Sequence, residues 1–576
     1  MLVMLIVIPM YRIYSHRSLL FIAIVGFFFL SRNSRTVISH VAGYVERIQP
    51  HSITIYDNYQ GYRVLGSYDI SLGDIVEVQG DFESIPITSE RVVYNVNHAK
   101  LSKTETSGGI RSWIWNRVKN SPVLQQILYG VNSDGHDWRV LVSVYVSGFL
   151  LLFYTFFRRW IGSYRAVQIN RFLSCAIAFL FGFRLATARL ALKSFLPIHA
   201  QIILILTLFP NSLLTPTFIM CYGVDLIHGI GRHWERLLPK LVRFIFYQAL
   251  FYRNNVIEHL CYRWIRYVYG LVYACAILAL FCPGIENIAL SLMNAIEAIL
   301  NSAFTNRFSI VGELHGMLAI GLILSYRKMS HKQFGYTLLL VSIFIVYNPF
   351  YRVTFIDVGQ GDATLVQYPF NSYTTLIDTG KESAKYKLLK ALTRQGVVEI
   401  NQLVITHPDT DHNGNQVFIE QRFHLKAITN KLESVVLADT VLDNQSFLED
   451  NENSRILVLP YNVLVTGDAY QLQEEIMARN HLIGCLSVLK LGHHGSKTST
   501  SDILLDTTQP KYVVISSKKS TYGHPHQQVL RKLHNRRIPY LHTETHGDIT
   551  IYINSIFHVV LTKKHTFDII EPVIKC

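Results

Sequence analysis

The sequence predicts a multi-domain protein: a polytopic α-helical membrane domain, a small β-barrel and a C-terminal soluble domain that carries a metal site. Three observations predict it. Long apolar runs fill much of the first 350 positions, short β-like runs occupy residues 37–97, and after residue 351 strands end repeatedly in His, Asp and Gly. With 576 residues, of which 50% are hydrophobic and 16% charged, the chain is too long for one core and too apolar for an ordinary soluble protein.

The N-terminal apolar segment is expected to anchor the chain in a membrane. Residues 18–30 are apolar and follow Arg12 and Arg17. A cleaved signal peptide is the alternative, but residues 31–34 lack the small-residue pattern of a cleavage site. The expected organisation is a membrane anchor at 1–35, a β domain at 36–100, a linker or amphipathic segment at 101–140, a polytopic membrane domain at 141–350 and a soluble domain at 351–576.

The β domain is expected to be a small barrel of the OB type. Residues 52–56, 62–65 and 74–78 are short β-like runs bounded by Gly, Asn or Asp. About five such strands suit an OB-like barrel, a fold that often binds single-stranded nucleic acid. Five tyrosines offer faces for stacking bases, although tyrosine is also an ordinary strand residue, and both interpretations stay open: Tyr44, Tyr56, Tyr59, Tyr62 and Tyr68.

The membrane domain is predicted from eight apolar runs, at 141–157, 172–185, 195–209, 213–230, 269–281, 285–299, 316–324 and 336–347. Arg184 and Arg189 lie within or beside them, and either face a water-filled path or extend to the membrane surface.

Charge gives a predicted orientation in the plasma membrane. Short basic stretches are expected to be cytoplasmic, which places both soluble parts on the extracytoplasmic side. These stretches contain Arg12, Arg17, Arg158, Arg159, Arg165, Arg327, Lys328 and Lys332. The net charge of +14 fits an anionic partner such as nucleic acid or acidic membrane lipid.

The strongest chemical signal is the segment at residues 403–414. Three β-favouring apolar residues end in a polar run that carries His407, Asp409, Asp411 and His412. Imidazole and carboxylate ligands together suit zinc, manganese or iron better than calcium, which prefers oxygen alone. A solvated turn is the alternative, but matching ligands follow at later strand ends.

The same pattern recurs along the C-terminal domain. β runs end in short Gly-containing segments that carry Asp357 and Asp362, Asp378, Asp468, His493 and His494 with Ser496, and His524 with His526. Several such segments converging from strand ends predict a metal-centred hydrolase site.

These motifs resemble the metallo-β-lactamase fold, an αββα sandwich with metal at its edge. With the apolar region and the OB-like region upstream, the whole chain resembles the ComEC family of competence proteins. Two positions depart from the pattern: Asp409 stands where many enzymes of this fold carry a second His, and Asn415 where Gly is common. Ser147-Gly148-Phe149 matches only part of the family's Ser-Gly-Leu-His segment.

The resemblance implies one or two divalent transition ions, zinc or manganese, and roles for individual residues. The metal ligands would be His407, Asp409, Asp411, His412, Asp468, His493 and His494, and the catalytic residues Asp411, Asp468 and His526. Substrate phosphate would contact Lys490, Ser496, Lys497, His524 and His526, while Asp357, Asp362 and Asp378 would support the ligands through hydrogen bonds.

The function implied is DNA uptake during natural transformation, with a channel for one strand and a phosphodiesterase domain that degrades the other. The implied partners are DNA, membrane lipid, a DNA receptor, a cytoplasmic ATP-driven translocase and further copies of the chain. Two alternatives stay open: a DNA channel whose hydrolase-like domain is inactive, and a membrane-anchored metallo-hydrolase with another substrate.

Overall fold

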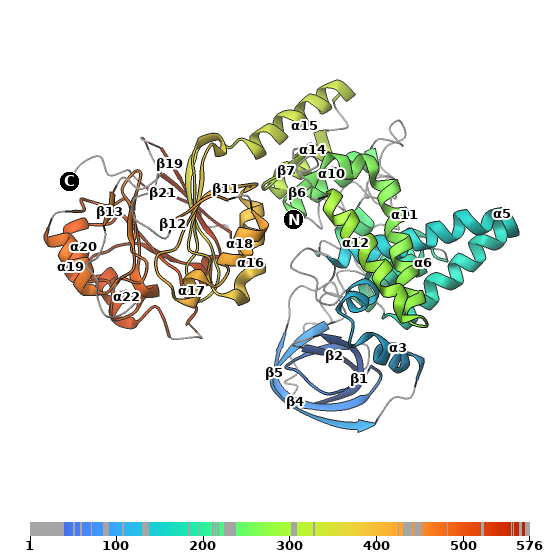
Figure 1. Ribbon diagram of the computed structural model, residues 1–576. Helices are drawn as coiled ribbons and strands as arrows, with labels where there is room; N and C mark the ends of the chain where they lie inside the picture. The colour runs from blue at the N-terminus through green and yellow to red at the C-terminus, as the bar shows by residue number, and fades with distance from the viewer. Residues whose placement is uncertain are drawn as a thin grey trace, which may run out of the picture. The chain divides into compact units, whose positions relative to one another are not determined.

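Figure 1 shows a computed structural model of the chain, which describes residues 40–570 apart from gaps. The longer gaps are 85–91, 106–108, 130–137, 224–237, 301–307, 326–328, 430–439, 443–450, 520–522 and 564–566, and shorter ones fall elsewhere. The predicted anchor at 1–35 therefore lies outside the described residues. The chain divides into two compact units, Met1–Ser309 and Ile310–Cys576.

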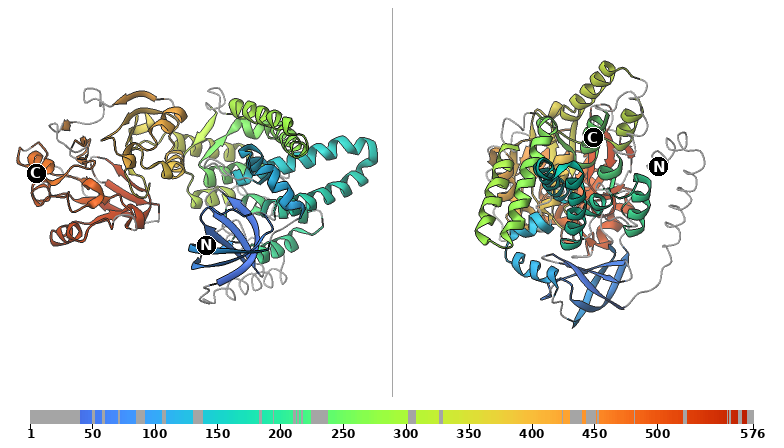
Figure 2. Two further views of the ribbon diagram at one scale, coloured as in Figure 1. Left: turned by 60° about the horizontal axis from the view of Figure 1, so that its bottom comes forward. Right: turned by 90° about the vertical axis from the view of Figure 1, so that its right-hand side faces the viewer.

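The first unit begins with a closed five-stranded barrel (Figure 2). Its strands follow the order β1-β2-β3-β5-β4, with β3 and β5 parallel and the other neighbours antiparallel. Buried Ile53, Ile55, Val64 and Val76 contribute to its core. A small five-stranded barrel is therefore confirmed. The strands are β1 (His40–Gln49), β2 (Ser52–Asp57), β3 (Gln60–Leu65), β4 (Ile75–Ser84) and β5 (Val92–Glu105).

The barrel tyrosines differ in how they are placed for stacking. Tyr44 is 40% exposed, whereas Tyr56 and Tyr62 are buried. Tyr62 stacks on Tyr94 inside the protein, with ring centroids 5.7 Å apart. Tyr68 is half-buried and its hydroxyl donates to the Leu65 carbonyl at 2.9 Å; Tyr59 lies outside the described residues. Nucleic-acid binding by this barrel stays a prediction.

Helices make up most of the rest of the first unit. They are α3 (Ile110–Val118), α4 (Pro122–Leu124), η1 (Gln125–Tyr129), α5 (Trp138–Leu180), α6 (Leu185–Leu192), α7 (Ile198–Leu208), η2 (Ile219–Gly223), α10 (Leu238–Phe251), α11 (Val256–Ala279), η3 (Pro283–Ile285) and α12 (Glu286–Leu300), with the short strand β6 (Arg253–Asn255). The short strand β7 (Ser309–Val311) begins at the last residue of the first unit and ends in the second.

Helices α5 and α11 touch backbone to backbone. A Cβ atom on Gly148 would collide with the Arg266 carbonyl oxygen, and one on Gly270 would lie 2.6 Å from the Gly148 carbonyl oxygen. The Arg266 guanidinium donates to the Ser147 carbonyl at 3.1 Å. The Ser147-Gly148 segment therefore makes a helix crossing that only glycine allows.

The prediction of a polytopic membrane domain at 141–350 is wrong for this structure. Among the helices that the structure describes, none is both long enough and apolar enough to cross a bilayer. The reason is that the apolar runs are divided among short helices. For example, α6 has 8 residues, α7 has 11 and α14 (Gly316–Ser325) has 10. At about 1.5 Å per residue these fall short of the roughly 30 Å hydrocarbon core.

Helix length is not the only limit. The longer helix α5 carries Arg158, Arg159 and Arg165 and has a non-helical residue at Gly162, and α11 carries Arg263 and Arg266. Arg189, in α6, lies with its guanidinium 5.5 Å from the Tyr222 ring centroid, and Arg184 lies outside the described residues.

The second unit contains two sheets. One has eight strands in the order β12-β11-β10-β9-β8-β19-β20-β21, and the other has six in the order β13-β14-β15-β16-β17-β18. The strands are β8 (Tyr351–Phe355), β9 (Thr364–Gln367), β10 (Thr374–Ile377), β11 (Ile400–Val404), β12 (Leu425–Thr429), β13 (Thr440–Leu442), β14 (Ile456–Leu459), β15 (Val463–Val465), β16 (Val488–Lys490), β17 (Tyr512–Ile515), β18 (Tyr540–His542), β19 (Ile549–Ile553), β20 (His558–Thr562) and β21 (Phe567–Ile570).

Helices cover the outer faces of both sheets (Figure 1). They include α16 (Lys385–Arg394), α17 (Thr410–Asn413) and α18 (Gln416–Arg422) beside the larger sheet, and α19 (Gln471–Arg479), α20 (Asp502–Thr508) and α22 (Gln527–Asn535) beside the smaller one. The others are α14, α15 (His331–Val346), η4 (Pro369–Asn371), η5 (Glu382–Ala384), η7 (Gly492–Gly495) and α23 (Thr543–His546).

Three apolar clusters hold these layers together. Residues such as Val353, Val404, Val465 and Val514 pack between the two sheets. A second cluster joins α16 and α18 to the larger sheet, and a third joins α19, α20 and α22 to the smaller sheet. The order of layers is therefore helix, sheet, sheet, helix, as the resemblance to the metallo-β-lactamase fold implied for residues 351–576. This places the carboxyl ends of β10, β11, β15, β16 and β17 in position to build one site.

Candidate metal centre

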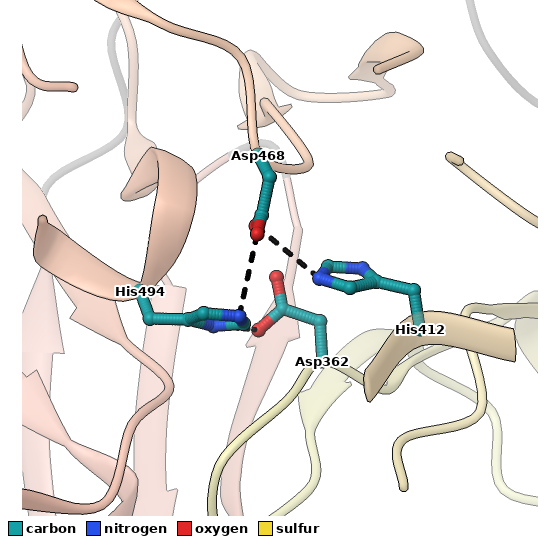
Figure 3. Close-up of side chains that lie close together, drawn as sticks. All are labelled: Asp362, His412, Asp468 and His494. Atoms are coloured by element: carbon teal, nitrogen blue, oxygen red, sulfur yellow. Dashed lines mark ion pairs between the residues drawn. The ribbon is translucent and has the colours of Figure 1, made fainter. Parts of the chain in front are cut away.

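Four buried side chains from separate loops converge at the edge of the sandwich (Figure 3). Asp362 lies between β8 and β9, His412 in α17, Asp468 after β15 and His494 in η7. One potential ligand atom of each lies within 4.8 Å of those of the other three. This spacing suits a bound metal ion.

Asp468 lies between three imidazoles. Its Oδ1 is 3.2 Å from Nε2 of His412, and its Oδ2 is 3.5 Å from Nε2 of His494 and 4.0 Å from Nε2 of His407. Two further carboxylates complete the group: Asp411 Oδ2 lies 3.4 Å from Nε2 of His494, and Asp409 Oδ2 lies 3.5 Å from Nε2 of His407. Six of the seven residues predicted to bind metal are thus brought together.

The three imidazoles are anchored through their other ring nitrogen. Nδ1 of His412 lies 2.8 Å from Asp378 Oδ2, and Nδ1 of His494 lies 3.0 Å from the Ser516 carbonyl. Nδ1 of His407 lies 3.1 Å from the Thr406 hydroxyl, which itself donates to Asp378 at 2.7 Å. A proton on Nδ1 leaves a lone pair on Nε2, which is the state that a metal ion requires.

The atoms that face the centre support this interpretation. Nε2 of His407, His412 and His494, and Oδ1 of Asp362 and Asp468, are buried and make no hydrogen bond with the described part of the chain. Buried polar atoms without a hydrogen bond are unfavourable, so a group that satisfies several of them at once is expected. The site therefore fits a divalent transition metal ion, whose identity the ligands do not select.

Without metal, the centre is a network of ion pairs. Burial disfavours the charged imidazolium and so lowers the pKa of His494, but the nearby carboxylates Asp468 and Asp362 outweigh this effect and raise that pKa to about 9. Asp468 and Asp378 likewise hold the pKa of His412 well above its ordinary value despite burial. In return, despite burial, His494 and His412 hold the pKa of Asp468 well below its ordinary value. The carboxylates thus favour the protonated forms of His412 and His494.

Lys490, predicted to bind substrate, lies in the interior. Its ammonium donates to Asp362 Oδ2 at 2.6 Å and to the Leu491 carbonyl at 3.0 Å, and its side chain is fully buried. Asp362, predicted to support the ligands, instead lies within the cluster itself, with Oδ1 3.4 Å from Nδ1 of His494. The positive charge beside Asp362 Oδ2 is therefore that of a buried side chain of the protein, Lys490.

Tight backbone contacts hold these loops. The Asp362 N–H donates to the Asp411 carbonyl at 3.1 Å, and a Cβ atom on Gly361 would collide with that same carbonyl. Gly361 also has φ of +125°, which an L side chain rarely adopts. The second glycine of the Asp357–Asp362 motif thus allows the loop after β8 to pack against the loop after β11.

The other predicted residues surround the cluster. His493 is half-buried, with Nδ1 2.8 Å from the Thr498 hydroxyl and its ring stacked on Tyr470. His524 lies with its ring centroid 6.2 Å from that of His493. His526 caps α22, because its Nδ1 accepts from the Gln528 N–H at 3.3 Å.

Three more predicted residues lie in the loops around the site. The Ser496 hydroxyl is buried and accepts from that of Thr498 at 3.1 Å, whereas Lys497 is exposed. Asp357 accepts from the Gly359 N–H at 3.2 Å, within its own turn. Of these, only Lys497 has its side chain largely in solvent.

Sequence reasoning missed Thr406, Ser516 and the role of Asn415. Thr406 bridges Asp378 and His407, and its position directly before the first ligand was the available signal. Asn415 Nδ2 donates to the Thr379 carbonyl at 2.8 Å and the Lys381 carbonyl at 2.7 Å, so it ties the Asp378 loop to α18. Ser516 acts through its backbone carbonyl, for which the sequence carries no signal.

The fold and the site together define a metallo-β-lactamase type of domain. The family model described as Metallo-beta-lactamase superfamily matches residues 356–460. This stretch contains Asp362, Asp378, His407 and His412, which supply part of the centre. The class predicted for residues 351–576 is therefore confirmed.

Three curated relatives show which proteins the chain resembles. It is 30% identical over 250 residues to Recombination protein 2 of Haemophilus influenzae, covering 38% of this chain and 31% of the relative. It is 28% identical over 251 residues to ComE operon protein 3 of Bacillus subtilis (34% and 32%), and 29% identical over 240 residues to Competence protein ComA of Neisseria gonorrhoeae (37% and 34%). The matches span about a third of each relative's length. They confirm the resemblance to the ComEC family.

Proposed function

We propose that the second unit is a metal-dependent phosphodiesterase that acts on DNA during uptake in natural transformation. The observation that carries this proposal is the position of Asp468, whose two oxygens lie within 4.0 Å of Nε2 of three anchored imidazoles. Such an arrangement of carboxylate and imidazole at a strand edge is typical of metallo-hydrolase sites. The names of the competence relatives support DNA as the substrate.

The chain's own residues have separate tasks in this proposal. One or two divalent ions would be held by Asp362, His407, Asp409, Asp411, His412, Asp468 and His494. When bound, such ions neutralise phosphate oxygens and lower the pKa of water. Asp468 joins the two halves of the centre, Asp378 orients His412, and Lys490 holds Asp362. His493, His524 and His526 at the rim, with exposed Lys497, contact the phosphodiester.

The proposed setting is the membrane where DNA enters the cell, and the competence relatives support a role in that process. A DNA receptor and an ATP-driven translocase remain the proposed partners. The predicted DNA channel required a polytopic membrane domain, and that prediction is wrong for the residues that the structure describes. The proposal therefore concerns the processing of DNA and does not include a channel.

The full chain tests the proposal through bound metal and hydrolysis. We expect the purified protein to retain zinc or manganese and to cleave double-stranded DNA and bis(p-nitrophenyl) phosphate. Asp468→Asn and His412→Ala should lose metal and lower kcat/KM roughly 100-fold or more, because each removes a ligand at the centre. His534→Ala, on the exposed side of α22, is the matched control and should match the wild type.

Three results would contradict this function. A protein that holds no transition metal, and whose Asp468→Asn variant takes up DNA like the wild type, would favour a non-enzymatic role in DNA handling. Hydrolysis of p-nitrophenyl acetate without any phosphodiester cleavage would favour another metallo-hydrolase activity. Activity that survives both ligand substitutions would place the reaction elsewhere in the chain.

A further inference from the structure

A cavity of about 340 Å³ lies in the second unit and shares no lining residue with the candidate metal centre. One side is apolar and comes from α14 and α15, with Leu318, Phe344 and Ile345 among its residues. The other side is polar and includes two buried guanidinium groups, those of Arg352 and Arg394. Glu313 and His315 also line the polar side, so the cavity places an apolar wall opposite a polar wall that carries both guanidinium groups and one carboxylate.

Arg352 is a buried cation that pairs with neutral acceptors. It is 4% exposed, and it donates to the side-chain oxygens of Gln367 and Asn371 at 2.8 and 3.0 Å and to the Gln395 carbonyl at 2.7 Å. These bonds use Nε and Nη2. Within the described residues, Nη1 makes no hydrogen bond and no carboxylate lies within ion-pair distance. A buried charge without a counter-charge is strongly unfavourable, so the surroundings of Arg352 favour an anion.

Arg394 does not remove this excess of positive charge. Its Nη2 pairs with Asp548 at 2.8 Å, so that charge is already balanced. Its Nε makes no hydrogen bond with the described chain and faces Glu313 only at 3.9 Å, and the Glu313 side chain is 36% exposed. The Nε–H of Arg394 and the Nη1 of Arg352 are therefore two donors available on the polar wall.

The apolar wall continues to the surface. Leu318 is 47% exposed and Phe344 is 65% exposed, although both line the cavity. On α15, the neighbouring Leu340 is 56% exposed. An apolar chain that leaves the cavity would therefore run along apolar side chains and gain from being removed from water.

We propose that this cavity binds a singly charged oxyanion with an apolar chain, its carboxylate or phosphate head at Arg352 and its chain along α14 and α15. The Nη1 of Arg352 and the Nε–H of Arg394 are donors that suit the oxygens of such a head. The volume is in the range of small-ligand sites. The site is independent of the metal centre and of the proposed hydrolysis.

Calorimetry on the full chain in non-ionic detergent tests this with four probes. Decanoate carries the head and the chain of a fatty acid, and dihexanoyl phosphatidylglycerol those of an anionic phospholipid. Decanol has the chain alone, and inorganic phosphate the head alone. We expect decanoate, the phospholipid or both to bind about tenfold or more tighter than either partial probe. Tighter binding of decanoate would identify the ligand as a fatty acid, and tighter binding of the phospholipid would identify it as an anionic phospholipid.

Two substitutions distinguish binding at this cavity from binding elsewhere. Arg352→Gln should weaken decanoate or phospholipid binding about tenfold or more, because it removes the charge. Leu318→Trp should do the same by filling the cavity while leaving every bond of Arg352 in place, so it also decides the matter if Arg352→Gln fails to fold. Arg536→Gln, whose guanidinium pairs with Asp506 at the surface, is the control.

Two outcomes would overturn the proposal. If decanol binds as tightly as decanoate, the charge of Arg352 contributes nothing to the affinity for the ligand. Unchanged affinity in Leu318→Trp would show that the ligand binds at another place.

Discussion

Asp378 holds His412 through the ring nitrogen that does not face the metal centre, with Oδ2 2.8 Å from Nδ1 of the imidazole. Its Oδ1 accepts from the Thr406 N–H at 2.7 Å. Both side chains are buried, and Asp378 holds this position with φ of +59°, which Asn also tolerates. The aspartate therefore sets which nitrogen of His412 faces the centre. This relationship makes Asp378 a support for the site although it lies outside the metal cluster.

Replacing Asp378 by Asn should weaken metal binding while the fold survives. Asn keeps one oxygen for the Thr406 N–H, but its amide nitrogen cannot accept from Nδ1 of His412. We expect metal affinity to fall about 10- to 100-fold. Equilibrium dialysis against a chelator measures it. Asp506→Asn, at an exposed surface pair with Arg536, is the control, and equal affinity in the two variants would contradict this role.

Metal affinity should rise with pH up to about 9. The pKa of His494 is raised to about 9 by Asp468 and Asp362, against the effect of burial. In the metal-free protein this imidazole therefore carries a proton at neutral pH, and a metal ion must displace it. Affinity should thus increase up to about tenfold per pH unit for each displaced proton, and the contribution of His494 should level off above its pKa.

Calorimetry in two buffers of different ionisation enthalpy measures the protons released. Release that grows as the pH falls below 9 would agree with the raised pKa of His494. Metal affinity that is flat between pH 6 and 8, with no proton release, would contradict it.

Gly361→Ala should destabilise the second unit far more than Gly359→Ala. Both glycines have positive φ, +125° and +83°, but a Cβ on Gly361 collides with the Asp411 carbonyl whereas one on Gly359 meets nothing within 4 Å. We expect a loss of about 2–4 kcal/mol at Gly361 and about 1–2 kcal/mol at Gly359. Denaturant unfolding followed by circular dichroism gives both values, and equal losses would mean that the close contact is unimportant.

Gly148→Ala should open the crossing of α5 and α11. The added Cβ would collide with the Arg266 carbonyl and lie 2.9 Å from the Gly270 backbone nitrogen, so the two helices must separate. Hydrogen exchange of both helices should speed up markedly. Gly321→Ala in α14 is the control, because open space surrounds that position and alanine favours a helix by roughly 1 kcal/mol. Unchanged exchange in Gly148→Ala would contradict the packing argument.

The sequence was informative where chemistry is local. His407, Asp409, Asp411 and His412 lie within six positions at the end of β11, so their residue types alone indicated a metal site. The strand-end motifs after residue 351 resemble the metallo-β-lactamase fold, and that resemblance implied the sandwich. It was misleading for residues 141–350, because hydropathy counts apolar residues without showing where a helix ends.

By itself, then, the sequence predicted the barrel and the set of ligand types, since these follow from strand periodicity and from residue chemistry within short segments. The class of the C-terminal domain followed from the resemblance of its motifs to a known fold. Only the tertiary structure decided which of the side chains lie close together. It brought Asp362 into the cluster, buried Lys490 behind it and left Arg352 beside a cavity without a counter-charge. The physical reason is that burial and pairing depend on contacts between residues more than a hundred positions apart, such as Lys490 and Asp362, which no local pattern records.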